Sequence, residues 1–369
     1  MGSSGILIKG NETLTSKERV RKVFEHENPD RVPVNFNGNA VITGKMMKYF
    51  GAKNDEELLA ALGVDFRNVG LPYTGRPLFE DNLPGRKINP LSGVHTKWIE
   101  HANGGYWDYC DFPLKDAELP EVENWPFPDP DNFDYDAALD YCLKNREMAL
   151  YAGNSGFGCA INCAGFVRGM EQTLVDVITD DPAGMLYIKK KIESDLACLE
   201  RLLEKCHKYL TFVWLGEDLS TQTGPMISLD LYRKQIKPHH KKLLDCIKYY
   251  NLPCLMHSCG SSSWVFDDLI EIGVNAVETL QPEAANMSPE FLKKNYGDRL
   301  TFHGCISTAG PLAFGNTNDL EKCVRETLAV MMPGSGYILA PSHRMQDNTP
   351  LENAVAMYTI AHKEGYYRQ

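Results

Sequence analysis

Short apolar segments alternate with segments of helical periodicity along most of the chain. The apolar segments lie at 32–36, 64–69, 149–156, 209–218, 252–260, 276–282, 299–308 and 336–343. The helical pattern predicts helices near 15–27, 55–62, 181–208, 229–250, 263–272, 318–332 and 350–364. Because short buried strands separated by helices are typical of parallel sheets, these eight strands predict an α/β protein with a closed (β/α)8 TIM barrel.

Two features extend this predicted barrel. Thr15 and Glu18 form a capping-box pattern, which predicts a helix ahead of the first strand. Residues at about 92–112 alternate polar and apolar on both sides of an Asn-Gly-Gly sequence, which predicts a β-hairpin insertion. No glycine-rich dinucleotide or phosphate-binding pattern follows any predicted strand, so a nucleotide-binding sheet has no support.

The segment 118–134 is rich in proline and acidic residues but also contains Trp125 and Phe127. We expect it to be an ordered stretch on the surface, with a disordered linker as the alternative. The whole pattern predicts a flexible N-terminus at 1–14 followed by a single barrel domain at 15–369.

Composition narrows the classes of partner. The 369 residues include 38 Lys and Arg against 49 Asp and Glu, a net charge of −11. This balance argues against nucleic acid and anionic membranes as partners. No apolar stretch has the length of a membrane span, and the N-terminus lacks a secretory layout. Eleven cysteines are therefore expected to be mostly reduced thiols in a cytoplasmic protein, several of them simply packed inside helices.

Metal-ligand side chains collect where the predicted strands end. In a TIM barrel the carboxyl ends of the strands and their following loops form the active site. The residues at these ends that carry such side chains are Glu217, Asp218, His257, Cys259, Glu278, His303, Cys305, His343 and Arg344.

His257 and Cys259 are the leading candidates for a metal site. Residues two apart on a strand face the same side, so both side chains can point at one ion. Cys305, two strands further round, is the expected third ligand, and imidazole with thiolate favours Zn²⁺. The alternative is structural: the histidine bonds a backbone carbonyl and the cysteines only pack.

The fourth ligand stays open between two residues. Glu217 is the first choice, because a carboxylate inside a barrel mouth needs a partner. His343 is the second, and a loop histidine that contacts Asp347 or a substrate is an equal alternative for it. His303 alternates with Cys305 and could share the same face.

Three stretches of the chain resemble a known family. They are "PDRVPV" near the start, "PLKDAELPEVENWPFPDPDNFD" in the middle, and "LMHSCGS", "FHGCIST" and "YILAPSHRMQDNTPLENAVAMY" in the last third. Together they resemble the uroporphyrinogen decarboxylase superfamily over about 15–365. The H-x-C motif with a later cysteine is similar to its corrinoid-dependent methyltransferase branch, which includes O-demethylase components.

The resemblance implies an enzyme that moves a methyl group between a small substrate and the cobalt of a corrinoid protein. It implies Zn²⁺ in this chain, a corrinoid (cobalamin) supplied by the partner protein, and compatibility with a homodimer. Asp218 or Glu278 would orient the ligands or donate a proton, with an ordinary salt bridge as the alternative, and Glu217 would act beside them. Tyr73, Asn154, His343 and Arg344 would contact the small-molecule methyl donor or acceptor.

Two departures from the family pattern shape the choice of reaction. The segment 35–44, where the decarboxylases place arginines for a tetrapyrrole, contains none here. The thiol methyltransferases carry a third metal cysteine after the last strand, where this chain reads "APSHR". We therefore expect a methoxylated or similarly methylated donor. A methylcobamide:thiol methyltransferase, a decarboxylase-like lyase for a small acid, and a catalytically silent binding barrel remain alternatives.

Overall fold

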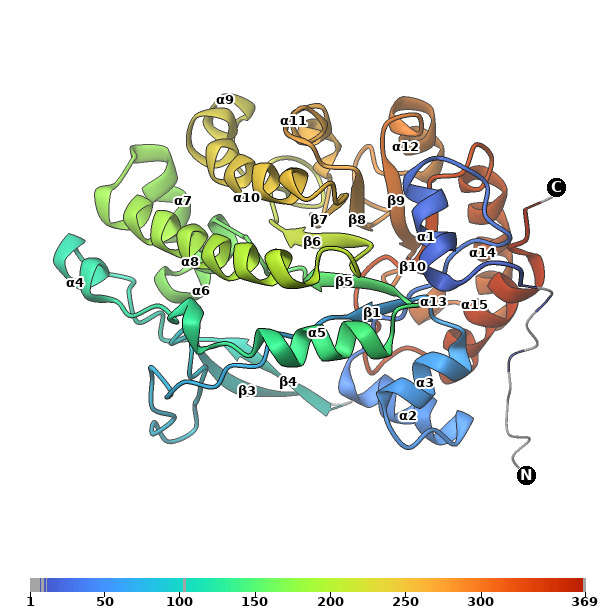
Figure 1. The fold of residues 1–369 in the computed structure, drawn as a ribbon, viewed down its shortest axis with the longest axis horizontal. Helices are drawn as coiled ribbons and strands as arrows, with labels where there is room; N and C mark the ends of the chain where they lie inside the picture. Colours follow the sequence, from blue (N-terminus) through green and yellow to red (C-terminus); the bar gives the residue numbers. More distant parts are fainter. Residues whose placement is uncertain (1–6, 8–9, 11, 102–103, 368–369) are drawn as a thin grey trace.

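A single curved parallel sheet forms the centre of the molecule. The computed structural model describes residues 7, 10, 12–101 and 104–367. Its main sheet has seven strands in the order β1-β5-β6-β7-β8-β9-β10, and Figure 1 shows helices packed around it. The strands are β1 (Phe66–Asn68), β5 (Ala149–Gly153), β6 (Phe212–Gly216), β7 (Cys254–His257), β8 (Ala276–Leu280), β9 (Thr301–Ile306) and β10 (Tyr337–Pro341). The predicted α/β TIM-barrel class is confirmed.

The eighth barrel position is a short seam instead of a full strand. The segment predicted as a strand at 32–36 makes one isolated parallel bridge, between Val34 and Leu339. The Leu339 amide donates to the Pro33 carbonyl, and the Asp65 amide donates to the Val34 carbonyl. This segment therefore joins β10 to the β1 side of the sheet. Proline has no N–H to donate, which limits the ladder at this position.

Buried ion pairs around Asp65 stabilise the segment that forms this seam. The Val34 amide donates to a carboxylate oxygen of Asp65 at 2.9 Å, so it is unavailable to the sheet. Asp65 is fully buried and also accepts from the guanidinium groups of Arg19, at 2.7 Å, and Arg31, at 2.8 Å. The two arginines hold the pKa of Asp65 below its usual value despite its burial. The "DRVPV" motif thus serves the barrel seam, and its arginine does not reach the mouth.

The helices cover the outside of the sheet. Those of eight residues or more are α1 (Ser16–Phe24), α2 (Ala40–Phe50), α3 (Asp55–Leu62), α5 (Tyr135–Lys144), α6 (Ile161–Arg168), α7 (Met170–Thr179), α8 (Pro182–Cys206), α10 (Lys237–Tyr249), α12 (Pro289–Tyr296), α14 (Thr317–Met331) and α15 (Leu351–Glu364). The shorter ones are α4 (Leu119–Asn124), α9 (Leu229–Leu231), α11 (Phe266–Ile272) and α13 (Pro311–Phe314). The seven predicted helices are present, with α1 capped by Thr15 as the capping box requires. The helices that the sequence pattern did not predict are α2, α4, α5, α6, α7, α12 and α13.

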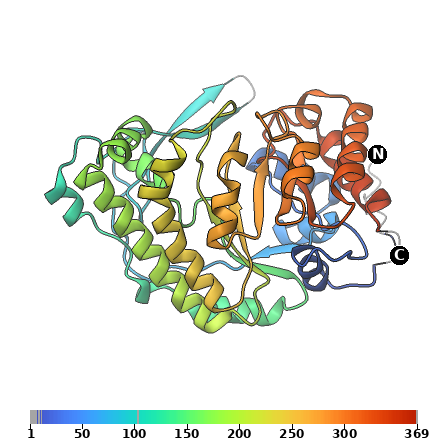
Figure 2. The same ribbon diagram turned by 90° about the horizontal axis from the view of Figure 1, so that it is seen from above.

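The predicted hairpin lies beside the barrel as part of a small antiparallel sheet. It is formed by β3 (His95–His101) and β4 (Gly104–Tyr109), with β2 (Lys87–Ile88) added at one edge. Tyr109 stacks on Phe166 of α6 with ring centroids 4.1 Å apart. His101, near the other end, lies 3.7 Å from the Asp347 carboxylate in the loop after β10. Figure 2 shows the two strands extending from α6 toward the C-terminal part of the barrel.

The acidic segment 118–134 is ordered, as expected. Trp125 is half-buried against the core, and its ring lies 4.7 Å from that of Phe79. Lys190 of α8 donates to the backbone carbonyls of Val122, Glu123 and Trp125. Within the part of the chain that the structure describes, none of the helices has the length and apolar character that a bilayer crossing requires. Residues 1–6, 8–9 and 11 of the predicted flexible N-terminus lie outside the described residues.

Candidate metal centre

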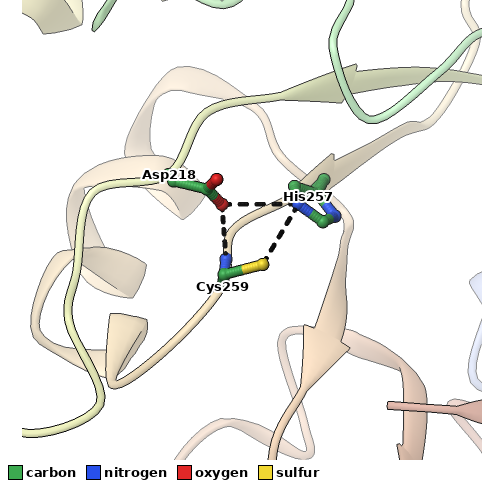
Figure 3. A group of neighbouring side chains, drawn as sticks. All are labelled: Asp218, His257 and Cys259. Carbon is green, nitrogen blue, oxygen red and sulfur yellow. Dashed lines mark hydrogen bonds and ion pairs between the residues drawn. The ribbon is translucent and has the colours of Figure 1, made fainter. Parts of the chain in front are cut away.

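A carboxylate, an imidazole and a thiol converge at the carboxyl ends of β6 and β7. Asp218, His257 and Cys259 each offer one ligand atom, and these atoms all lie within 4.8 Å of one another. Nε2 of His257 lies 3.3 Å from Oδ1 of Asp218 and 3.4 Å from Sγ of Cys259. Figure 3 shows the three side chains facing one another at the ends of neighbouring strands.

The backbone places these three side chains. His257 is the last residue of β7, and Cys259 follows it on the same side before Gly260 turns the chain with φ +73°. The Cys259 amide donates to Oδ1 of Asp218 at 2.9 Å. The other Asp218 oxygen accepts from the Asn162 side-chain amide at 2.7 Å. Asp218 is therefore anchored on both oxygens before any ion binds.

Glu278 of β8 sets the orientation of the imidazole. Its carboxylate contacts Nδ1 of His257, and the Thr279 hydroxyl lies 2.7 Å from the same nitrogen. With Nδ1 facing these oxygens, Nε2 is the nitrogen that faces Asp218 and Cys259. A carboxylate behind a histidine fixes its tautomer and increases its basicity toward a metal.

The charges of this group are strongly coupled. The Glu278 carboxylate, followed by Asp218, raises the pKa of His257 well above its usual value, although burial opposes this. The His257 imidazole in turn lowers the pKa of Asp218 and of Glu278 against the effect of their own burial. Burial raises the pKa of the Cys259 thiol. A cation that replaces the His257 proton would also stabilise the thiolate form of Cys259.

His303 lies deeper in the barrel, behind Glu278. Its Nε2 is 2.9 Å from the side-chain nitrogen of Asn35, and its Nδ1 is 4.0 Å from Glu278. The His303 side chain does not point at the same position as Cys259, so it lies behind the ligand group and is not part of it. Burial lowers the pKa of this imidazole, which favours its neutral form.

Glu217 does not reach the ligand group. Its carboxylate is fully buried and accepts hydrogen bonds from the backbone amides of Ala160, Ile161 and Asn162 at 2.6, 3.0 and 3.1 Å. Nε2 of His240 lies 3.3 Å from the same carboxylate. The first amides of a helix have no acceptor within the helix. The three amides at the start of α6 therefore donate to the two oxygens of Glu217. The expected fourth ligand is thus a helix cap, and its neighbour Asp218 takes the place at the mouth.

Cys305 also lies outside the ligand group. Its thiol is buried with Cys323 and Glu290 of the outer helices nearby, and burial raises its pKa. The prediction assumed strict alternation along β9. However, Gly304 has φ +127° and Cys305 has φ +71°, and the β8–β9 register shifts beside Thr279. These irregularities break the two-residue period, so His303 and Cys305 do not share a face.

The four expected substrate contacts have different positions. His343 is half-buried near the ligand group. Its burial, followed by the positive charge of His257, lowers the pKa of His343. Arg344 is exposed and lies 3.4 Å from the Asn37 side chain. Asn154 lines a cavity of about 340 Å³ that also includes Asn68 and Phe157.

Tyr73 lies away from these contacts. Its ring packs on Phe133 with centroids 5.0 Å apart, and its hydroxyl donates to the Arg76 carbonyl at 3.1 Å. The structure therefore brings only His343 close to the ligand group, while Asn154 and Arg344 border the mouth and Tyr73 serves a surface turn.

Most of the cysteines are free thiols, as expected, and one pair is an exception. Cys159 and Cys163 form a disulfide at the start of α6, with Cα atoms 5.7 Å apart. The nine other cysteines are free. Cys163 lies in the first turn of α6, whereas Cys159 precedes this helix, which begins at Ile161.

The donor set fits a catalytic zinc site. Three protein ligands of the Asp, His and Cys types leave a coordination position for a substrate, whereas structural zinc sites are closed by four protein ligands. The preformed support also fits, because residues outside the ligand group orient Asp218 and His257. The fold and this geometry together define a TIM-barrel protein with a candidate metal centre in its mouth.

Comparison with known proteins supports the same family as the sequence motifs. Residues 193–364 match the family model "Uroporphyrinogen decarboxylase (URO-D)". The matched residues include the candidate metal centre. A solved structure, "methyltransferase from Methanosarcina mazei", is similar with a TM-score of 0.64 and 18% identity over 95% of this chain and 99% of that chain. At this identity the likeness concerns the fold. No curated protein sequence matches the chain.

Proposed function

We propose that this protein is a zinc-dependent methyltransferase that acts with a corrinoid-carrying partner protein. The observation that carries the proposal is the convergence of Asp218, His257 and Cys259 at the barrel mouth. The likeness to a methyltransferase structure supports the reaction class, and the family match supports the superfamily. The proposed donor is a small methoxylated or similarly methylated molecule.

Zinc bound here would supply Lewis acidity toward the atom that carries the methyl group. The residues of the chain supply its placement. Glu278 holds Nδ1 of His257, so that Nε2 stays directed at the mouth. Asn162 and the Cys259 amide hold the two oxygens of Asp218, which prevents this carboxylate from turning away. Such fixed ligands need little reorganisation when the substrate arrives.

In this proposal His343 serves the methyl donor. It is half-buried near the ligand group, and burial keeps its pKa low, so it is neutral near pH 7. A neutral imidazole can accept or donate a hydrogen bond to the heteroatom that loses the methyl group. Contact with the substrate was one of the two roles expected for His343, and this proposal adopts it.

Tetrapyrrole decarboxylation is less well supported. A substrate with many carboxylates requires several cationic side chains at the mouth. Here Arg19 and Arg31 are buried in ion pairs with Asp65, and Arg67 pairs with Glu56. These three arginines lie near the first strands, and all of them are already paired with carboxylates of this chain.

The first test concerns the metal. We expect the purified protein, after dialysis against zinc, to hold about one equivalent, and Cys259→Ala and Asp218→Asn to lose most of it. Cys254→Ala is the matched control, because this buried cysteine lies on the same strand and outside the ligand group. Full zinc retention in Cys259→Ala, with the protein folded, would contradict the proposed site.

The second test concerns the reaction. The protein is mixed with a corrinoid protein reduced to Co(I) and with candidate methoxylated donors, and the cobalt absorption spectrum is followed. We expect methyl-cobalt formation with the zinc-loaded protein and none with Asp218→Asn. Transfer that proceeds equally after zinc removal would refute the metal-dependent mechanism.

A further inference from the structure

The disulfide between Cys159 and Cys163 lies next to the candidate metal centre, within a chain whose other nine cysteines are free. The disulfide closes a loop of only a few residues. In the chain-entropy view, so short a loop contributes the smallest stabilisation that a disulfide offers. A role in holding distant parts of the fold together is therefore a poor explanation for this bond.

The surroundings of the pair suit both of its redox states. Both sulfur atoms lie near the Gly156 carbonyl oxygen, at 3.1 Å for Cys159 and 3.6 Å for Cys163. After reduction each thiol would have this acceptor within reach, so both S–H groups keep a hydrogen-bond partner inside the protein.

Cys163 can be reached from a cavity. It lines a space of about 450 Å³ between α6 and the hairpin, together with Trp107, Tyr109 and Phe166. Cys159 is completely buried behind it, whereas Cys163 is 9% exposed. Cys163 is therefore the member of the pair that a small thiol reagent in this cavity would approach, and thiol–disulfide exchange in a folded protein depends on such access.

The same segment supports the end of β6. The Phe157 carbonyl accepts from the Gly216 amide at 2.9 Å, and the amides that follow Cys159 hold Glu217. Asn162, one residue before Cys163, donates to Asp218 at 2.7 Å. The bond between the two cysteines thus restrains the turn that positions a proposed metal ligand.

We propose that Cys159 and Cys163 form a reversible redox site whose state adjusts the candidate metal centre through Asn162 and Asp218. A dithiol reductant attacks the accessible sulfur of Cys163 as a thiolate, the S–S bond breaks, and a mixed disulfide forms. The second thiol of the reductant then releases Cys163. The protein gains two electrons and two protons as two thiols, and the reductant leaves as its own disulfide.

Thiol labelling of the full, folded protein tests the redox site. The protein is incubated with or without dithiothreitol, alkylated with N-ethylmaleimide, and mapped by peptide mass spectrometry. We expect Cys159 and Cys163 to be labelled only after reduction, and the bond to form again with oxidised dithiothreitol. Labelling before reduction, or resistance to reduction until the protein is denatured, would overturn the proposal.

Zinc affinity tests the coupling, which rests on the proposed metal site. After anaerobic removal of dithiothreitol, zinc is titrated against a colorimetric chelator. We expect reduction to weaken zinc binding about five-fold or more, and Cys159→Ser with Cys163→Ser to bind as weakly without responding to reductant. The matched control is Cys142→Ser with Cys206→Ser, a neighbouring pair of free thiols on α5 and α8, which should keep the response.

Equal zinc affinity in the two redox states would overturn the coupling. The labelling result does not depend on zinc, so failure of the proposed metal site and failure of the redox site give different outcomes. A protein that binds no zinc but shows reversible labelling would contradict only the proposed function and the coupling.

Discussion

Replacing Glu278 by glutamine tests how the protein prepares His257 for a metal. Glu278 is buried, and its carboxylate contacts Nδ1 of His257 while lying 4.0 Å from Nδ1 of His303. Glutamine keeps the size of the side chain and one acceptor oxygen, so the imidazole stays oriented. What is lost is the negative charge that raises the pKa and the basicity of His257.

The expected magnitude depends on pH. Loss of a carboxylate behind a metal-binding histidine typically weakens metal binding about 10- to 100-fold, which corresponds to about 1.4 to 2.7 kcal/mol. In the metal-free protein the same change lowers the pKa of His257, so fewer protons compete with the metal. We therefore expect the full loss for Glu278→Gln at alkaline pH and a smaller difference near pH 6.

The measurement is a zinc titration against a colorimetric chelator at several pH values between about 6 and 9. Glu283→Gln is the control, because this carboxylate accepts from Ser307 and does not contact His257. Thermal unfolding checks that each variant is folded. If Glu278→Gln binds zinc within two-fold of the unchanged protein at the alkaline end, the reasoning about the carboxylate is refuted.

Three further predictions concern stability and protons. Asp65→Asn removes the carboxylate that two buried arginines share, while Glu12 and Asp30 still pair with them, so we expect a loss of up to about 3 kcal/mol in urea unfolding. The lowered pKa of Asp65 contributes stability that is present above its unfolded pKa of about 3.8 and is lost as the pH falls through the lower folded value. The variant lacks this carboxylate, so it should lose less stability on acidification than the unchanged protein. An equal loss in both proteins would contradict this. Gly216→Ala places a Cβ 1.8 Å from a backbone carbonyl oxygen of the α6 loop, so the melting temperature and zinc affinity should both fall, whereas Gly224→Ala, with open space around it, should change neither. Zinc binding should displace protons from His257, whose raised pKa keeps it charged, and from the Cys259 thiol. The zinc affinity should therefore rise with pH, and calorimetry in two buffers should detect the released protons. A zinc affinity that does not depend on pH would argue against these ligands.

The alternation of short apolar segments was sufficient to predict the barrel. Seven of the eight predicted strands are regular strands, because buried parallel strands are short and nearly all apolar. The exception at 32–36 depends on Asp65, whose side chain takes the Val34 amide from the sheet. That bond joins residues far apart in sequence, so no local pattern could reveal it.

The candidate site was predictable where the strand is regular. His257 and Cys259 meet because β7 ends without irregularity, so the two-residue period holds. The period fails at Cys305, where two consecutive positive φ angles turn the thiol outward. Local sequence suggests glycine for one such angle but gives little reason to expect cysteine at the other.

The choice between Glu217 and Asp218 required the tertiary structure. Neighbouring residues at a strand end point in different directions, so only one of the two can face the mouth. The amides at the start of α6 need an acceptor, and the longer Glu217 side chain reaches them. The sequence pattern does not predict α6, so it gives no sign that the first amides of this helix need an acceptor.

The seam at Val34 has a consequence for how the chain is made. Its partner Leu339 belongs to β10, which is the last strand to leave the ribosome. Until then β1 and the growing sheet have open edges, and unpaired edges readily join with other chains. Closure of the barrel therefore cannot precede the synthesis of β10, and the early segment at 32–36 stays without its partner strand until then.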